Sequence, residues 1–303
     1  MKGVSEQRRA ALAMALLALI WGYSWIIGKL GLAHAGPFRF AAARVLVAVV
    51  ALGAFLVATG RFPSRRPPRG TVLVGLAQTT AFLLLNTWAL SRGGAGKTAI
   101  LTFTMPFWVL LFAWPVLAER VVGLQWLAIA CALAGLVSIV EPWRLHANLV
   151  AEVLGALAGM SWAIGVVLTK RLQREGPADA LDFTFWQMTV GLLPMLLVAG
   201  LSDEPPIEWS PLLVAAIVYS GIVSTALGWL MWQYVLNRLP AGTTSLASLA
   251  VPVVATISGA LQLGERLRPA EITGAALIAV ALAMMSWQSM RTHHRDDLSM
   301  AQE

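Results

Sequence analysis

Amide and aromatic side chains recur at helical spacing inside otherwise apolar stretches of the sequence. Three of them are four residues apart and would share one face of a helix: Gln78, Phe82 and Asn86. A similar group lies nearer the N-terminus at Trp21, Ser24 and Trp25. An amide has up to four hydrogen-bonding sites to satisfy, and an indole offers a broad apolar face with one N–H donor. These residue types favour noncovalent binding of a small organic molecule.

Further candidates of the same types lie in the second half of the chain: Trp162, Trp186, Ser224 and Trp232. Ser224 and Trp232 follow Gln78 and Asn86 by 146 residues, and Trp162 follows Trp21 by 141. We predict that all ten residues line a substrate-binding cavity. The alternative is structural, because small residues let helices approach closely and tryptophans near helix ends anchor at the membrane interface.

Two cations and two prolines also interrupt apolar stretches. Lys29 and Arg44 are expected near the outer ends of their helices, where they either snorkel to the membrane surface or attract a substrate carboxylate. Pro106 and Pro252, again 146 residues apart, are expected to remove a backbone hydrogen bond and kink their helices. Matching kinks would suit a gate, and a static bend is the alternative.

Groups that could do acid–base or metal chemistry are placed elsewhere. The four histidines lie at helix ends or in the C-terminal tail, at His34, His146, His293 and His294. Cys131 is the only cysteine, so no internal disulfide or redox pair is expected. The central thirds of the expected helices contain no Asp, Glu or His. We therefore predict no catalytic site, no metal and no cofactor, and we do not expect an enzyme.

The elements that must position these residues are transmembrane helices. Of the 303 residues, 58% are hydrophobic and 12% are charged, and the mean hydropathy is +0.73. A soluble domain carries about 25% charged residues, and a helix needs about 20 apolar residues to cross a bilayer. Continuously apolar runs exclude a β-barrel. We expect ten spans, at 10–30, 38–59, 70–91, 95–117, 122–141, 151–170, 181–200, 211–236, 242–263 and 270–290.

Lys and Arg residues are distributed unequally between the two sides of this arrangement. With the N-terminus inside, 14 of the 22 lie on the cytoplasmic side, and the acidic 203–208 connection lies outside. Cytoplasmic loops carry the excess of such residues, so both termini are predicted to face the cytoplasm from the cell inner membrane. The net charge of +7 therefore points to the lipid bilayer as the partner and not to nucleic acid.

Internal repetition is the most informative feature of the chain. At a shift of 146 residues, Ala95-Gly96 meets Ala241-Gly242, Pro106 meets Pro252, and Glu119-Arg120 meets Glu265-Arg266. We predict two five-helix repeats, 1–147 and 148–303. Because five is odd, the second repeat enters from the opposite side, and the fold class is an all-α membrane protein with inverted repeats.

The chain resembles the EamA-type permeases of the drug/metabolite transporter superfamily. The similarity rests on Leu19-Ile20-Trp21-Gly22 with Lys29, Ala43-Arg44, the region around Pro106, Glu119-Arg120 and Gln125-Trp126 in the first half, and on Pro252, Glu265-Arg266 and Gly274 in the second. The second half has no clear counterpart of Arg44. The resemblance implies ten helices and export of amino acids or other metabolites.

The function that we predict is a secondary transporter that exports small organic metabolites, with aromatic or other hydrophobic amino acids as the favoured class, through a central cavity by alternating access. A channel-like facilitator is one alternative, although channels usually repeat by oligomerisation around a pore and an inverted repeat within one chain favours alternating access. An intramembrane enzyme is another, although it would need acids, bases or metal ligands at membrane depth. A monomer and a homo-oligomer are both open.

Overall fold

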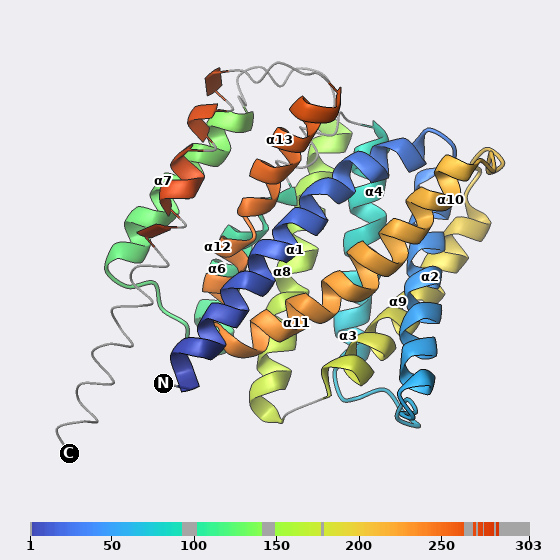
Figure 1. Cartoon of the computed structure of the whole chain (residues 1–303), viewed down its shortest axis with the longest axis horizontal. Helices are drawn as coiled ribbons and strands as arrows, with labels where there is room; N and C mark the ends of the chain where they lie inside the picture. The colour runs from blue at the N-terminus through green and yellow to red at the C-terminus, as the bar shows by residue number, and fades with distance from the viewer. Residues whose placement is uncertain are drawn as a thin grey trace.

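The structure, a computed structural model, describes residues 2–92, 102–140, 149–176 and 179–263, with short pieces at 269–270, 272–274, 276–281 and 283–284. Within these residues every regular element is a helix, and the helices run together as one bundle (Figure 1). The tenth expected span is described only in part, and the Glu265-Arg266 pair lies outside the described residues.

Helices of the first half follow the expected apolar stretches. The first two are long and continuous, α1 (Lys2–Leu32) and α2 (Pro37–Ala58). The third stretch is divided by its hydrogen bonding into α3 (Thr71–Val74), the π-helix η1 (Gly75–Ala81) and α4 (Phe82–Arg92). The shorter helices α6 (Met105–Leu117) and α7 (Leu124–Val140) follow.

The second half repeats this order. Two long helices, α8 (Leu149–Glu175) and α9 (Ala180–Leu201), are followed by a stretch with a π-segment in its middle. That stretch comprises α10 (Pro211–Val218), the π-helix η3 (Tyr219–Leu227) and α11 (Gly228–Arg238). Next comes α12 (Ala241–Ala247), whose counterpart at 95–101 lies outside the described residues, and then α13 (Ala250–Leu263), which matches α6 at the shift of 146. The two π-helices end 146 residues apart, so the repeat extends to this local irregularity.

Helix length separates the expected spans into two groups. Six stretches are long and apolar enough to cross a membrane: Arg8–Leu32, Pro37–Ala58, Thr71–Arg92, Val150–Glu175, Ala180–Leu201 and Pro211–Arg238. Four apolar helices are shorter: Met105–Leu117, Leu124–Ser138, Ala241–Ala255 and Ile272–Ala281. An all-helical fold with membrane-length helices is confirmed for the described residues, whereas ten spans in two inverted repeats stay a prediction.

The two prolines that were expected inside helices lie at helix starts. Pro106 is in the first turn of α6 and Pro252 is in the first turn of α13, and a turn precedes each helix at 103–104 and at 248–249. The first N–H groups of a helix have no partner within it, so a proline there removes no helical hydrogen bond. The expected kinks are therefore replaced by breaks ahead of both prolines, and a gating role stays a prediction.

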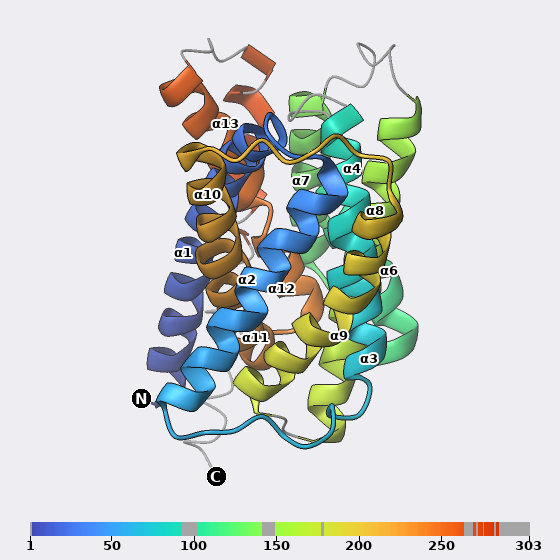
Figure 2. The same ribbon diagram turned by 90° about the vertical axis from the view of Figure 1, so that its right-hand side faces the viewer.

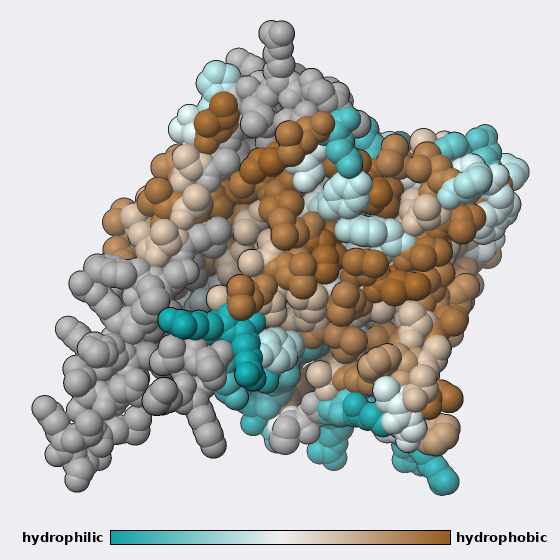
Figure 3. All heavy atoms as spheres, viewed as in Figure 1, coloured by the Kyte–Doolittle hydropathy of each residue, from teal (hydrophilic) through white to brown (hydrophobic). Residues whose placement is uncertain are grey.

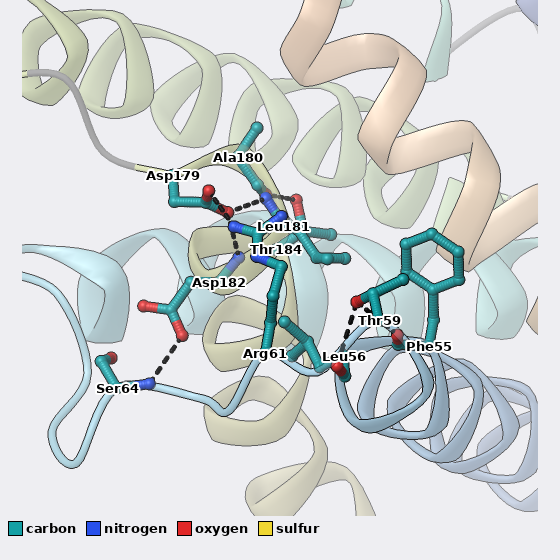
Figure 4. Close-up of polar contacts among 10 residues, drawn as sticks. All are labelled: Phe55, Leu56, Thr59, Arg61, Ser64, Asp179, Ala180, Leu181, Asp182 and Thr184. Carbon is teal, nitrogen blue, oxygen red and sulfur yellow. Dashed lines mark hydrogen bonds and ion pairs between the residues drawn. The ribbon is translucent and has the colours of Figure 1, made fainter.

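One end of the bundle carries the start of α1 and the 59–70 connection, and we call it the N-terminal side (Figure 2). Two contacts attach this connection to the start of α9 (Figure 4). Arg61 pairs with Asp179, which caps α9, and the Ser64 N–H donates to Asp182 Oδ1 at 2.9 Å. The long connection is thus attached to the second half of the chain.

The other end, which we call the opposite side, carries the 33–36 and 202–210 connections. Glu204 joins them, because its carboxylate accepts two backbone N–H bonds from the first turn of α2 at 2.7 and 3.0 Å. The Glu208 N–H also donates to the His34 carbonyl at 2.9 Å. The two connections therefore lie on the side away from the 59–70 connection, as the expected topology requires.

Apolar side chains cover much of the outer surface of the bundle. Figure 3 shows them across the middle of one face, with polar side chains gathered toward the two ends. The exposed large hydrophobic residues come from many helices and include Leu12, Val50, Leu73, Leu111, Leu193 and Leu212. An apolar surface of this extent fits contact with lipid.

Helices of the two halves pack against each other through the centre of the bundle. α1 packs along α13, α2 along α9 and η3, and α4 and α6 along α8. One large core cluster joins buried residues from both halves, among them Trp21, Val45, Trp162 and Trp232. The centre of the molecule is therefore a place where residues distant in sequence meet.

Candidate functional site

A cavity lies at this centre and contains most of the predicted site residues. Seven of the ten line it: Trp21, Ser24, Trp25, Phe82, Asn86, Trp162 and Ser224. Its lining runs along α1 from Trp21 to Gly28 and along α4 from Phe82 to Leu90, which is toward the opposite side. The space between the lining atoms, including the open mouth, is about 680 Å³.

Three tryptophans, Trp21, Trp162 and Trp229, form the floor of the cavity, and Trp232 packs behind them. Trp21 is the hub tryptophan, because its ring centroid lies 5.4 Å from that of Trp162 and 5.6 Å from those of Trp229 and Trp232. Its Nε1 donates to the Ser224 carbonyl at 3.0 Å. The Nε1 donors of the other three are buried and have no hydrogen-bond partner among the described residues. The floor is therefore a rigid apolar surface with unused donors at membrane depth.

Arg44 supplies the cavity with a positive charge. Its Nε and Nη2 both donate to Thr225 Oγ1, at 3.1 and 3.0 Å, and Nη2 also donates to Ser224 Oγ at 3.3 Å. Both acceptors are neutral hydroxyls on η3. Arg44 therefore lines the cavity, and its hydrogen bonds run to η3 and not to the membrane surface. Its expected role toward a substrate carboxylate stays a prediction. Lys29 is exposed and is not part of the lining.

Gln78 does not line the cavity with Phe82 and Asn86, contrary to the prediction. It lies in η1, one turn nearer the N-terminal side than Phe82. A Cβ on Gly165 of α8 would lie 2.5 Å from the Gln78 Cβ, whereas Phe82 packs on Trp162 of the same helix. Gln78 is fully buried against α9, where its Oε1 accepts a bond from Gln187 Nε2 at 3.2 Å. Phe82 and Asn86 remain in the cavity.

A chain of amides closes the bundle below the tryptophan floor, toward the N-terminal side. Gln173 Nε2 donates to Gln233 Oε1 at 3.0 Å, Gln233 Nε2 donates to Gln187 Oε1 at 3.5 Å, and Gln187 donates to Gln78. This amide chain links α8, α11, α9 and η1. Nearby, Lys170 Nζ donates to the carbonyls of Leu236 and Leu239 at the end of α11.

Arg174 adds an ionic contact on the same side. It pairs with Glu119 (Nη2 to Oε1, 2.7 Å), and Glu119 Oε2 also accepts the Gly242 N–H at 3.3 Å. The contact joins the ends of α6 and α8 to the start of α12. The cavity is therefore sealed on the N-terminal side by polar contacts between the two halves.

Gln187 occupies the place in the second half that Arg44 occupies in the first. A Cβ on Gly221 would lie 2.8 Å from the Arg44 carbonyl oxygen, and a Cβ on Gly75 would lie 2.8 Å from the Gln187 carbonyl oxygen. Arg44 bonds to Ser224 and Thr225, whereas Gln187 bonds to Gln78 and Thr79, 146 residues earlier. The counterpart that the sequence did not reveal is thus an amide.

Three of the predicted residues need a separate account. Trp186 lies at the N-terminal side, where its Nε1 donates to Ser64 Oγ at 3.0 Å, so it is remote from the cavity. Trp232 is fully buried behind the floor, and Gln78 belongs to the amide chain. Trp229 lines the cavity although it was not among the predicted residues. It lies on α11, three residues before the predicted Trp232.

Comparison with known proteins places the whole chain in one family. The profile of the EamA-like transporter family matches residues 8–141 and again residues 149–287. A solved crystal structure superposes with a TM-score of 0.77 and 18% identity, over 92% of this chain and 98% of that one. This likeness bears on the fold alone.

Curated relatives resemble the chain over nearly its full length. An uncharacterised transporter of Bacillus subtilis (YoaV) is 26% identical, covering 93% of this chain and 98% of the relative. A probable amino-acid metabolite efflux pump of Salmonella typhimurium is 28% identical, covering 91% and 94%. A probable terminal-alkyne amino-acid exporter of Streptantibioticus cattleyicolor is also 28% identical, covering 89% and 90%.

Proposed function

This chain belongs to the EamA-like transporter family, and from that premise we propose that it is a secondary carrier that exports amino acids or related small metabolites by alternating access. The family and the names of the relatives indicate a transporter. The substrate class and the mechanism are our proposal. The observation that carries it is a cavity between the two halves that extends toward one side and is sealed on the other.

The seal favours a carrier over a channel. A channel in its open state needs a continuous path. Here the path is blocked by the tryptophan floor and by the amide chain of Gln78, Gln173, Gln187 and Gln233. An intramembrane enzyme has less support still, because no Asp, Glu, His or Cys lines the cavity as far as the structure describes it. Binding and release without a chemical step suit this lining.

Alternation is supported by the matched contacts of the two halves. The Arg44 contact with η3 and the Gln187 contact with η1 are built on glycines 146 residues apart. If the halves exchange conformations, as inverted repeats allow, the Gln187 side, which is sealed now, opens. We propose that ten helices in two inverted five-helix repeats provide this exchange.

The N-terminal side is proposed to be the cytoplasmic side of the inner membrane, with both termini in the cytoplasm. The Lys/Arg distribution supports this orientation. A fluorescent reporter fused at Glu303 should be active, and alkaline phosphatase inserted in the 203–210 connection should be active too, because that enzyme works only outside the cytoplasm. Activity of a cytoplasmic reporter in the 203–210 connection would contradict the orientation.

The transport proposal is tested with purified protein in liposomes. We expect labelled amino acids to enter vesicles that are preloaded with the same unlabelled amino acid, and this counterflow should saturate with concentration. Because the central thirds of the expected spans contain no Asp, Glu or His, downhill flux should need no proton or sodium gradient. Linear, non-saturating flux without counterflow would favour the channel-like facilitator, and absence of flux for every amino acid would refute the substrate class.

A further inference from the structure

We propose that Arg44 is a carboxylate-binding residue, and that the cavity recognises carboxylic acids with an apolar or aromatic body by their carboxylate and not by their amino group. The proposal rests on the proposed function and narrows its substrate class. It assigns one chemical group of the ligand to one side chain of the cavity.

The hydrogen bonds of Arg44 leave one edge of its guanidinium unused. All three bonds come from Nε and Nη2 and end on neutral hydroxyls of η3, and among the described residues none is found for Nη1. Nη1 carries two N–H donors. Arginine binds carboxylates with short, charge-assisted bonds, so the unused edge can take the ligand while Thr225 and Ser224 hold the side chain in position.

The charge of Arg44 is not balanced by the protein at this place. None of the described carboxylates forms an ion pair with it, although a charge at membrane depth is costly without a partner. A bound carboxylate would supply the missing negative charge. The cavity lining otherwise contains no charged side chain within the part of the chain that the structure describes.

Gln187 shows that the fold does not need a charge at this position. Gln187 belongs to the second half and makes the equivalent contacts with Gln78 and Thr79 of the first half, at 3.2 and 3.4 Å. It is a neutral amide. Packing against a glycine of the neighbouring π-helix is the same in both cases. The packing that both halves share is therefore structural. The positive charge, which only Arg44 brings, is available to bind the ligand.

The rest of the wall fits the body of such a ligand. Trp21, Trp162 and Trp229 form the floor, and Phe82 packs on Trp162 with ring centroids 4.7 Å apart. Aromatic faces bind apolar and aromatic groups well. An ammonium group would find aromatic faces, which attract cations by about 0.5–2 kcal/mol, and neutral oxygens such as Asn86 Oδ1, but no carboxylate in the described lining. We therefore expect it to contribute less to selection than the carboxylate does.

The test measures binding to purified, detergent-solubilised protein, by isothermal titration, for three ligands of one shape. They are L-phenylalanine, 3-phenylpropionate, which lacks the amino group, and L-phenylalaninamide, which lacks the carboxylate. We expect the two acids to bind with affinities within about tenfold of each other, since a cavity without acidic residues distinguishes them weakly. The amide should bind at least about tenfold more weakly than L-phenylalanine.

Variants assign the effect to Arg44. Arg44→Gln, which copies the residue of the second half, should weaken both acids by about 10- to 100-fold and leave the amide unchanged. Arg44→Lys should retain part of the affinity, because a lysine keeps the charge but not the guanidinium geometry. Lys29→Gln removes an equal charge outside the cavity and should bind like the unchanged protein. Size-exclusion profiles and circular dichroism check that Arg44→Gln remains folded.

Outcomes separate this proposal from the transport proposal. Equal binding of acid and amide, no binding of any of the three ligands, or unchanged acid binding in Arg44→Gln would overturn the carboxylate assignment. If Arg44→Gln is unfolded, Arg44→Lys is used instead. The carboxylate assignment is also overturned if Arg44→Lys binds the acids as tightly as the unchanged protein does and binds the amide as tightly as the acids. Arg44-dependent binding without counterflow in liposomes would refute the carrier proposal and support the carboxylate site. Full counterflow of acids by Arg44→Gln would support the carrier proposal and refute the carboxylate site.

Discussion

Replacing Gln187 by leucine should open the sealed side of the bundle. Gln187 is the central member of the amide chain: it donates to Gln78 at 3.2 Å and accepts from Gln233 at 3.5 Å. Leucine has a similar bulk and keeps the packing, but it can make neither bond. The buried amides on both sides of it would lose a partner in the sealed state, where water does not replace it.

The size of the effect follows from these two bonds. Each is longer than an ideal hydrogen bond, so a contribution of about 0.5–1 kcal/mol each is reasonable. Together they amount to about 1–2 kcal/mol, which changes the ratio of sealed to open molecules by about 5- to 30-fold. In the proposed exchange, the amide chain forms only in the sealed state, so its loss acts on that state alone.

The assay uses a cysteine behind the seal. Thr169 is fully buried, its Oγ1 has no hydrogen-bond partner among the described residues, and it lines a small pocket with Gln233 and Gln173. In a Cys131→Ala background, the rate at which a water-soluble maleimide modifies Thr169→Cys reports how often the sealed side opens. We expect Gln187→Leu to raise this rate about 5- to 30-fold.

The matched control is Gln125→Leu, the same chemical change at an amide in the first turn of α7, whose Oε1 accepts the N–H of Val122 just before the helix. It should leave the labelling rate unchanged. A rate for Gln187→Leu that equals the rate of this control would refute the idea that the amide chain holds the seal. An equal increase in both variants would indicate general loosening of the protein and would count against the idea as well.

Three further changes test other parts of the structure. Gly228→Ala would place a Cβ 2.6 Å from the hub tryptophan's Nε1 and should lower ligand affinity in titrations, whereas Gly200→Ala, with no atom within 4 Å of its Cβ, should not. Burial raises the pKa of the Asp179 carboxyl, but bonds from the backbone N–H groups of α9 and from the paired arginine outweigh it, so the pKa lies below its ordinary value. A lowered pKa stabilises the fold fully above the unfolded-state value of about 4, and this contribution is lost as pH falls through the folded-state pKa. Asp179→Asn should therefore cost about 0.5 kcal/mol in thermal unfolding at pH 7, a small figure because the pair is half exposed, and progressively less as pH falls below about 4. Pro106→Ala and Pro252→Ala should change the rate of counterflow more than the affinity, and unchanged rates in both would favour a purely structural role at the helix breaks that precede these prolines.

Much of the fold follows from local sequence features. Apolar runs of about 20 residues predict membrane helices wherever they occur, and this holds for the six long stretches of the structure. The repeat was visible because Gly, Pro and Glu-Arg recur at a constant shift. Boundaries failed where a helix breaks inside an apolar run, as at 103–104 and 248–249, because hydropathy does not change there.

The site was predictable in its residue types and less so in its geometry. Seven of the ten predicted residues meet in one cavity, since aromatic and polar residues in membrane helices usually face the interior. Trp186 was misplaced because its hydrogen-bond partner, Ser64, comes from a connection 122 residues away. Arg44 was expected near the outer end of its span, with snorkelling and attraction of a carboxylate both open, and the hydroxyls that hold it belong to a helix about 180 residues later.

The sequence alone therefore determined the class of the protein: membrane helices, a duplicated chain, a family of transporters and the residue types of its cavity, all of which depend on composition and on spacing along the chain. Only the tertiary structure decided which of those residues meet. Gln78 and Phe82 are one turn apart on one helix, yet Phe82 packs on Trp162 in the cavity and Gln78 bonds to Gln187 of α9, because their partners come from helices distant in sequence. The pairing of Arg44 with one half and of Gln187 with the other likewise depends on how helices distant in sequence pack, and no local pattern contains that information.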